Sequence, residues 1–194
     1  MKSQDPPIEL LQPIVNLFTN GKLQQALSDT NQLLKKFPNS VILCNISGAS
    51  NSGLMQFDEA IVSYKMALEI KPDHAEAYYN MGIALKNKND IEAAIDSYKK
   101  ALEIKPDYVQ AYFNIGNILK SKNDLEAAID SYKKVLEIKP DHAEAYYNMG
   151  IALKDTGDLE AAIASYKKVL EIKPDYVEAY NNMGIALKDT GDLE

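Results

Sequence analysis

The chain has 194 residues, 46% of them hydrophobic and 25% charged, which is the composition of a folded globular protein and excludes a disordered chain. A net charge of −7 argues against nucleic acid as the main partner, because phosphate backbones attract basic proteins. The single cysteine, Cys44, excludes an intramolecular disulfide framework. Neither a signal peptide nor a membrane-length apolar run is recognisable, so we expect a cytoplasmic protein with no membrane contact.

Residues 1–40 and 41–74 carry a weak form of a pattern that becomes clear further along the chain. We expect a pair of helices in each, with 1–40 as an atypical first unit, because the end of a repeat array faces water on one side. In the first unit, Pro13 and Ile14 stand where the unit 75–108 has Met81 and Gly82. Proline in a helix removes one hydrogen bond, so the sequence predicts a short or kinked first helix.

From residue 75 onward the chain repeats with a period of 34 residues, marked by Lys-Pro-Asp before each new unit. The full units are 75–108, 109–142 and 143–176, and 177–194 is a partial unit. Apolar residues recur at steps of three and four within each unit, which predicts two amphipathic helices. The prolines end the second helix and start the next turn: Pro72, Pro106, Pro140 and Pro174.

Two further features recur in every unit. An aspartate stands where it can cap the second helix, and a glycine lies inside the first helix, where it costs about 1 kcal/mol relative to alanine. We expect these glycines to let the paired helices approach closely, opposite the small residues Ala94, Ala128 and Ala162. The aspartates are Asp90, Asp124, Asp158 and Asp192, and the glycines are Gly82, Gly116, Gly150 and Gly184.

Units of 34 residues with these spacings resemble tetratricopeptide repeats. The residues that carry the resemblance in one unit are Tyr78, Met81, Gly82, Leu85, Ala94, Tyr98, Ala101 and Pro106. The resemblance covers nearly the whole chain. It implies an all-α, right-handed solenoid of about five helix pairs and one trailing helix in one continuous domain.

In that family the first helix of each pair lines a concave groove. The resemblance places one asparagine per unit there: Asn80, Asn114, Asn148 and Asn182. An asparagine amide both donates and accepts hydrogen bonds, which suits an extended peptide backbone. The column resembles the asparagine ladder that holds substrate peptides in O-linked N-acetylglucosamine transferases. Two alternatives remain: duplication copied a neutral asparagine, or each asparagine bonds a neighbouring repeat.

Two other columns complete the predicted peptide-binding set, together with Asn117. The aromatic column is Tyr79, Phe113 and Tyr147. Exposed aromatic rows often serve recognition, and packing between repeats is the alternative. The basic column is Lys86, Lys120 and Lys154, which binds a partner or simply forms a solvated face.

The sequence contains no pattern typical of catalysis, cofactor binding or metal binding. His74 and His142 fall in turns two repeats apart, about 20 Å if helix layers are about 10 Å thick, and too far to share a metal. We interpret both as solvated turn residues. Cys44 replaces an aromatic core residue of later units, so we expect a buried thiol. The prediction is a protein that is not an enzyme.

The favoured function is a scaffold that binds an extended peptide or a partner protein in the groove. The chain stops inside a predicted second helix, so we expect it to be a fragment of a larger protein. Two alternatives stay open: a module that presents substrates to a downstream transferase, and a scaffold that assembles with itself. The trailing helix carries an apolar stripe of Tyr180, Met183 and Leu187, which we expect to mediate self-association.

Overall fold

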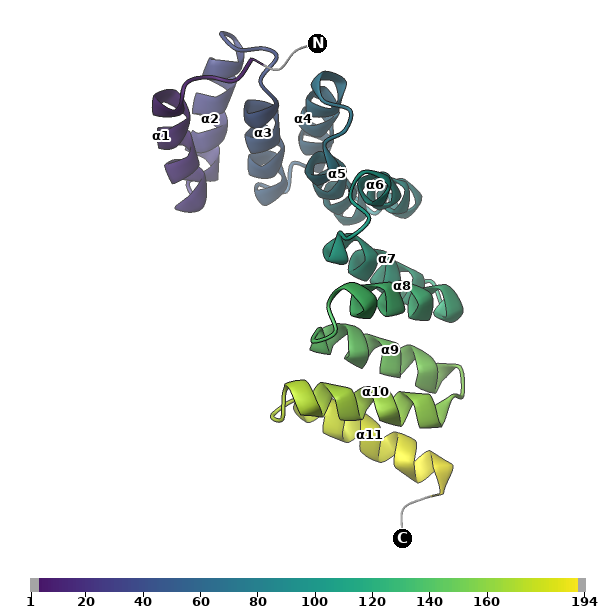
Figure 1. Ribbon diagram of the computed structural model, residues 1–194. Helices are drawn as coiled ribbons and strands as arrows, with labels where there is room; N and C mark the ends of the chain where they lie inside the picture. The colour runs from purple at the N-terminus through teal and green to yellow at the C-terminus, as the bar shows by residue number, and fades with distance from the viewer. Residues whose placement is uncertain (1–3, 192–194) are drawn as a thin grey trace. The chain divides into compact units, whose positions relative to one another are not determined.

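A computed structural model describes residues 4–191, and over this range the chain forms eleven α-helices and no strand (Figure 1). The predicted all-α fold of helix pairs is confirmed. The helices fall into two compact units, one ending at Pro106 and the other starting at Asp107. That all the repeats form one continuous domain stays a prediction.

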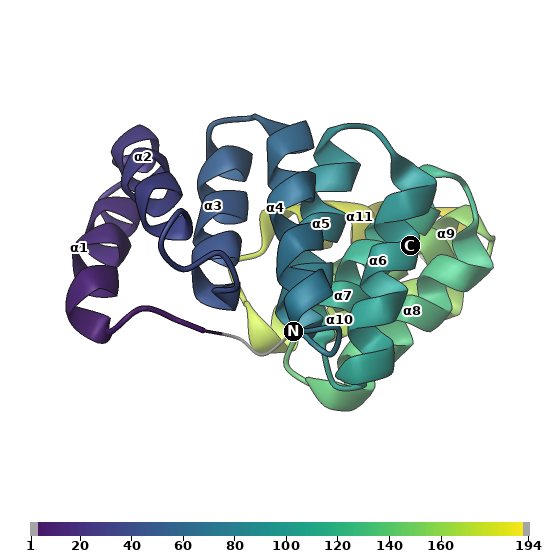
Figure 2. The same ribbon diagram turned by 90° about the horizontal axis from the view of Figure 1, so that it is seen from above.

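The first unit contains three helix pairs, and each helix packs against the next along the chain (Figure 2). They are α1 (Ile8–Thr19), α2 (Leu23–Leu34), α3 (Val41–Gly53), α4 (Phe57–Ile70), α5 (Ala75–Asn87) and α6 (Ile91–Ile104). Pro13 does not shorten α1, which runs for 12 residues through the proline. Pro13 and Glu9, whose carbonyl would have received the missing hydrogen bond, are both exposed, so water can bond that carbonyl instead.

The second unit contains two helix pairs and a further first helix, again packed in chain order with short turns between them (Figure 1). They are α7 (Val109–Ser121), α8 (Leu125–Ile138), α9 (Ala143–Asp155), α10 (Leu159–Ile172) and α11 (Val177–Thr190). α11 lies against α10, and within the described residues no second helix follows it.

The centre of four helix pairs is a tyrosine ring that lies directly over a glycine. A β-carbon added to the glycine would lie 2.6–2.7 Å from a ring carbon, closer than any real contact. The predicted close approach is therefore confirmed, but the partner is the tyrosine and not the alanine that we expected. The four contacts are Gly48 with Tyr64, Gly82 with Tyr98, Gly116 with Tyr132, and Gly150 with Tyr166.

In the first helix pair the larger side chain is on the first helix and the smaller one is on the second. Ile14 on α1 stands at the glycine position, and Thr30 on α2 stands at the tyrosine position. Both side chains are buried, and Thr30 Oγ1 donates a hydrogen bond to the carbonyl of Ala26 at 2.6 Å. A large residue on the first helix therefore accompanies a small one on the second.

The predicted aspartate caps form at only one of the described second helices. Asp158 Oδ1 accepts a hydrogen bond from the Ala161 backbone N–H at 3.1 Å. The side chains of Asp90 and Asp124 make no such bond to α6 and α8, although both precede those helices. Asp192 lies outside the described residues.

Candidate functional site: the first-helix surface

The predicted peptide-binding residues all lie on first helices, and all are half-buried. Tyr79, Asn80 and Lys86 belong to α5 in the first unit. Most of the set belongs to the second unit, where it lies on α7, α9 and α11: Phe113, Asn114, Asn117, Lys120, Tyr147, Asn148, Lys154 and Asn182. We call these eight residues the first-helix surface.

A chain of hydrogen bonds joins three helices on this surface. Lys120 Nζ on α7 donates to Asn148 Oδ1 on α9 at 2.8 Å. Asn148 Nδ2 donates in turn to Asn117 Oδ1 on α7 at 3.1 Å. The same Asn117 oxygen accepts from the hydroxyl of Tyr132 on α8 at 2.8 Å. We call this group of four residues the Asn117 network, and it links the surface to the tyrosine under it.

A second bridge crosses between α9 and α11. Asn182 Nδ2 donates a hydrogen bond to the hydroxyl of Tyr147 at 3.0 Å. Asn148 and Asn182 therefore both bond the preceding repeat, as one of the two alternatives for the asparagine column anticipated. This inter-repeat role leaves each amide with further hydrogen-bonding capacity, because a primary amide can take part in four bonds.

The aromatic column packs against the turns between repeats. The Phe113 ring centroid lies 5.0 Å from that of His142, and the Tyr147 centroid lies 5.1 Å from that of Tyr176. In the first unit Asn45 occupies the equivalent position, and its Nδ2 lies 2.9 Å from His74 Nε2. Asn45, Phe113 and Tyr147 thus each join a repeat to the turn that follows it, which is the packing alternative.

The interpretation of the two histidines as solvated was wrong. Both are half-buried, and the side chain of His142 is only 18% exposed, because an aromatic or amide side chain packs against each. His142 Nδ1 also accepts a hydrogen bond from the Ala145 backbone N–H and caps α9. Burial lowers the pKa of both imidazoles, and for His142 the Glu144 carboxylate opposes the shift only in part.

The basic column is not a uniformly solvated row. Partial burial lowers the pKa of Lys120, whose ammonium group is held by Asn148. Lys154 lies in the last turn of α9, with Nζ 3.8 Å from the carboxylate of Asp155. The positive charge of Lys120 is therefore partly desolvated, which strengthens its interaction with any anionic or polar group that approaches it.

Comparison with known families agrees with this architecture. A family model described as TPR repeat matches residues 56–89, 84–121, 116–157 and 152–191. The chain belongs to the TPR repeat family. The matches begin at residue 56, so α1, α2 and α3 lie outside them.

Three similar proteins illustrate the likeness. A peroxisomal targeting signal receptor of Candida glabrata is 35% identical over 87 residues, which make up 45% of this chain and 15% of the receptor. The crystal structure of MamA is 29% identical, covers 84% of this chain and 95% of its own, and has a TM-score of 0.78. YrrB, whose structure is titled a TPR protein with an unusual peptide-binding site, is 22% identical with a TM-score of 0.74 over 91% of each chain. At that identity the likeness to YrrB shows the fold alone.

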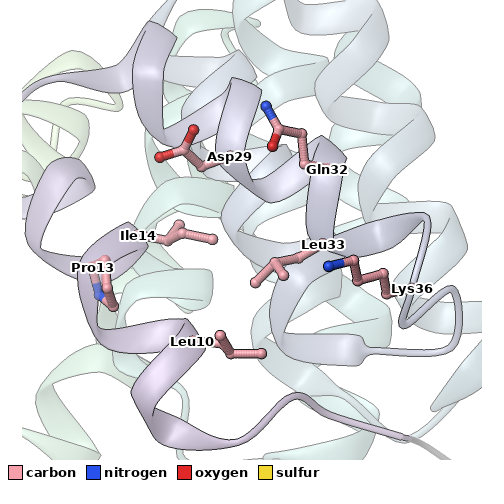
Figure 3. Close-up of a pocket in the computed structure, with 7 residues that line it drawn as sticks. All are labelled: Leu10, Pro13, Ile14, Asp29, Gln32, Leu33 and Lys36. Atoms are coloured by element: carbon pink, nitrogen blue, oxygen red, sulfur yellow. The ribbon is translucent and has the colours of Figure 1, made fainter.

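A cavity lies between α1 and α2 (Figure 3). It measures about 210 Å³, and Leu10, Ile14 and Leu33 form its apolar floor, with Asp29 and Lys36 among its polar neighbours. A comparable hollow lies between α7 and α8, beside Tyr112, which stands at the repeat position of Leu10. A hollow thus recurs at the same repeat position in two helix pairs, and the predicted peptide-binding residues line neither copy.

The remaining candidate residues carry no catalytic feature. Cys44 is 1% exposed, as expected for a buried thiol, and burial together with the nearby Asp5 carboxylate raises its pKa to about 11. Within residues 4–191, no group of three or more histidine, cysteine or acidic side chains is arranged to hold a metal ion. None of the described helices combines the length and apolarity needed to cross a membrane.

The apolar stripe of the trailing helix is partly open. Tyr180 is 51% exposed, and Met183 and Leu187 are half-buried. The second helix that we expected to follow α11 begins at Asp192 and lies outside the described residues. Self-association through these side chains stays a prediction.

Proposed function

We propose that this TPR chain is a protein-interaction scaffold whose second unit binds an extended segment of a partner protein along the first-helix surface. The observation that carries the proposal is the pair of inter-repeat amide bridges, Lys120–Asn148–Asn117 and Asn182–Tyr147. They hold two asparagines of successive repeats in fixed orientations. Fixed side chains lose less conformational entropy when a ligand binds.

The bridges leave bonding groups for a peptide. Asn148 uses one amide hydrogen and one oxygen lone pair, so one of each remains. Asn182 uses one amide hydrogen, and within the described residues its oxygen receives no hydrogen bond. A peptide main chain offers both a donor and an acceptor at each residue, which matches what the two amides can still bond.

One relative supports the same kind of role, because it is named a targeting signal receptor. This chain spans only about 15% of the receptor that it resembles, so the receptor's whole function is not transferred to it. We propose peptide binding without catalysis, and we expect neither a cofactor nor nucleic acid as a partner.

The experiment uses peptides selected from a phage-displayed random library against the full chain. Binding of the selected peptides is measured by fluorescence anisotropy to the wild type and to the double variant Asn148→Ala, Asn182→Ala. Loss of two hydrogen bonds, each worth about 0.5–1.5 kcal/mol, predicts affinity weaker by roughly tenfold or more. Lys167→Ala on the exposed face of α10 is the control and should leave affinity unchanged.

Chemical denaturation of the same variants separates binding from folding. We expect the double variant to keep a cooperative unfolding transition, since helix-surface substitutions remove only a small part of the free energy of unfolding. Full affinity combined with a large loss of stability would show that the asparagines only hold the repeats together, and the proposal would fail.

A further inference from the structure

A pocket with a mostly polar wall lies where α2, α3 and α4 meet in the first unit, and its volume is about 320 Å³. We call it the α3 pocket. That volume suits a single side chain or a small molecule, because pockets for larger ligands extend to about 1,000 Å³. The residues that line it are Asn31 on α2, Ser47 and Asn51 on α3, and Asp58, Glu59, Val62 and Ser63 on α4.

Two core residues of the later repeats are replaced in the wall of the α3 pocket. Ser47 and Asn51 stand at the repeat positions of Met149 and Leu153 on α9. Both of those side chains pack against a cluster of buried apolar residues. The units 75–108 and 109–142 also have large apolar residues there: Met81 with Leu85, and Ile115 with Leu119. The serine and the asparagine therefore place polar groups and free space where other repeats have a filled apolar core.

The hydrogen bonds of the wall use up its hydroxyl donors. Ser63 Oγ donates to the carbonyl of Glu59 at 2.8 Å, so in the 3.1 Å contact between Ser47 Oγ and Ser63 Oγ the donor is Ser47. Asn51 Nδ2 lies 3.5 Å from Ser47 Oγ, which is a long and weak bond. The Asn51 side chain is 5% exposed, and within residues 4–191 its Oδ1 accepts no hydrogen bond. The wall is left mainly with acceptors.

The charges beside the α3 pocket are more negative than at the same place in the later repeats. Glu59 replaces an alanine, and Asn31 replaces a lysine. Asp58 is paired with Lys88 at 2.5 Å, whereas the Glu59 carboxylate pairs with no cation of the described chain. The residues replaced are the alanines Ala93, Ala127 and Ala161, and the lysines Lys65, Lys99, Lys133 and Lys167. An acceptor-rich wall beside an unpaired carboxylate favours a ligand that is a cation and a donor.

The remaining wall residue is apolar. Val62 is 58% exposed, and Asp96 and Asp130 stand at its position in the units 75–108 and 109–142. An exposed valine beside a polar pocket gives the methylene groups of a long basic side chain an apolar surface to cover.

We propose that the α3 pocket binds the guanidinium group of an arginine side chain of a partner protein. A guanidinium is a cation with five N–H donors and no acceptor, which matches a wall that offers Asn51 Oδ1, serine lone pairs and the Glu59 carboxylate. The arginine stem lies on Val62. A lysine ammonium has the charge but presents fewer donors from a single point, so it satisfies this wall less well. The site belongs to the first unit and does not depend on the peptide binding proposed for the second.

The probe is N-acetyl-arginine N-methylamide, titrated into the ¹⁵N-labelled full chain and followed by nuclear magnetic resonance. We expect saturable shifts of the Asn51 side-chain amide and of the backbone amides near Glu59 and Val62, with a dissociation constant on the order of 1 mM. The citrulline derivative has the same shape without the charge and should bind at least about tenfold more weakly, as should the lysine derivative. Equal binding of either derivative, or no saturation by the arginine derivative at about 50 mM, would overturn the proposal.

Filling the pocket tests its role directly. Ser47→Met with Asn51→Leu recreates the residues of the later repeats, so the double variant should keep or raise its melting temperature and lose the arginine-dependent shifts. Undiminished shifts in the folded double variant would contradict the proposal.

A pair of charge variants on α4 tests the pocket without altering the core. Glu59→Ala should weaken binding of the arginine derivative at least about fivefold, because an ionised acceptor is lost. Glu69→Ala removes the same charge from another exposed position of α4 and should leave binding unchanged. An equal effect of the two variants would show that arginine is attracted only by the net negative charge of the chain, and would overturn the proposal. Both positions are exposed, so this comparison decides the matter even if the double variant does not fold.

Discussion

The hydroxyl of Tyr132 donates a hydrogen bond to Asn117 Oδ1 at 2.8 Å, and it is fully buried. The equivalent hydroxyls of Tyr98 and Tyr166 are also buried, but they have no hydrogen-bond partner in the described structure. The difference comes from one position on the first helix, where Ile83 and Ile151 replace Asn117. Three nearly identical repeats therefore differ in whether a buried polar group is satisfied.

This difference predicts opposite effects for one substitution at two sites. Tyr132→Phe removes the buried hydrogen bond that Asn117 Oδ1 accepts from the tyrosine hydroxyl. The substitution should therefore lower the free energy of unfolding by about 1 kcal/mol. Tyr166→Phe removes a buried hydroxyl that has no partner, so it should be neutral or stabilising. Urea denaturation measures both, and equal losses in the two variants would rule out the role assigned to Asn117.

The helix caps give a second matched comparison. Asp158→Ala removes the hydrogen bond to the Ala161 N–H and should cost about 1 kcal/mol. Asp124→Ala should cost less, because the Asp124 side chain makes no capping bond and contributes only its charge near the start of α8. Thermal unfolding of the two variants decides the point. An equal loss of stability in both variants would mean that the aspartate stabilises the helix through its negative charge near the N-terminus, and not through the capping hydrogen bond.

The histidines predict a dependence of stability on pH. Burial lowers the pKa of His142 below its ordinary value of 6.5, so the unfolded chain binds the proton more readily than the folded chain. The contribution of His142 to stability is therefore complete above about pH 6.5 and declines as the pH falls below it.

A tyrosine supplies the control for this pH effect, because Tyr176 occupies the same position in the next repeat and packs on Tyr147. His142→Tyr should keep a ring beside Phe113 and lose the titration. Stability measured across the acidic range should fall less steeply for His142→Tyr than for the wild type. Parallel curves would exclude His142 as a source of acid sensitivity.

The reversed pair Ile14 and Thr30 predicts coupling between two residues. Thr30→Tyr alone places a ring against an isoleucine and overfills the first helix pair, at a cost of about 1–3 kcal/mol. Adding Ile14→Gly recreates the arrangement of the later repeats and should recover part of that loss. A double-mutant cycle measures the interaction, and strictly additive changes would show that the two positions do not share space.

The helix pairs could be predicted from the sequence because their signals are local and repeated. Lys-Pro-Asp and the steps of three and four recur in register, so each unit supports the assignment of the others. In the sequence alone Ile14 is a departure from the pattern, because the residue that compensates for it, Thr30, lies on the other helix of the pair. Only the packing of α1 on α2 connects the two.

The candidate site was less predictable, because its contacts cross between repeats. The sequence places Phe113 and His142 almost a full repeat apart, and no periodic pattern says that their rings meet. The same holds for Asn182 and Tyr147. A visible signal did exist: the turn residue alternates between histidine and tyrosine, both flat rings, which is unusual for a solvated position.

The exchange of bulk between Ile14 and Thr30 also bears on how the chain finds its order while folding. Repeats this similar could pair a first helix with the second helix of the wrong unit at little loss. α1 is excluded from such errors, because Ile14 cannot sit under the tyrosine of another unit. Conversely, α2 set against any glycine-bearing first helix would leave an empty space where a ring belongs. Because α1 and α2 each pack well only with the other, their pairing restricts the pairings that are left to the similar helices of the later units.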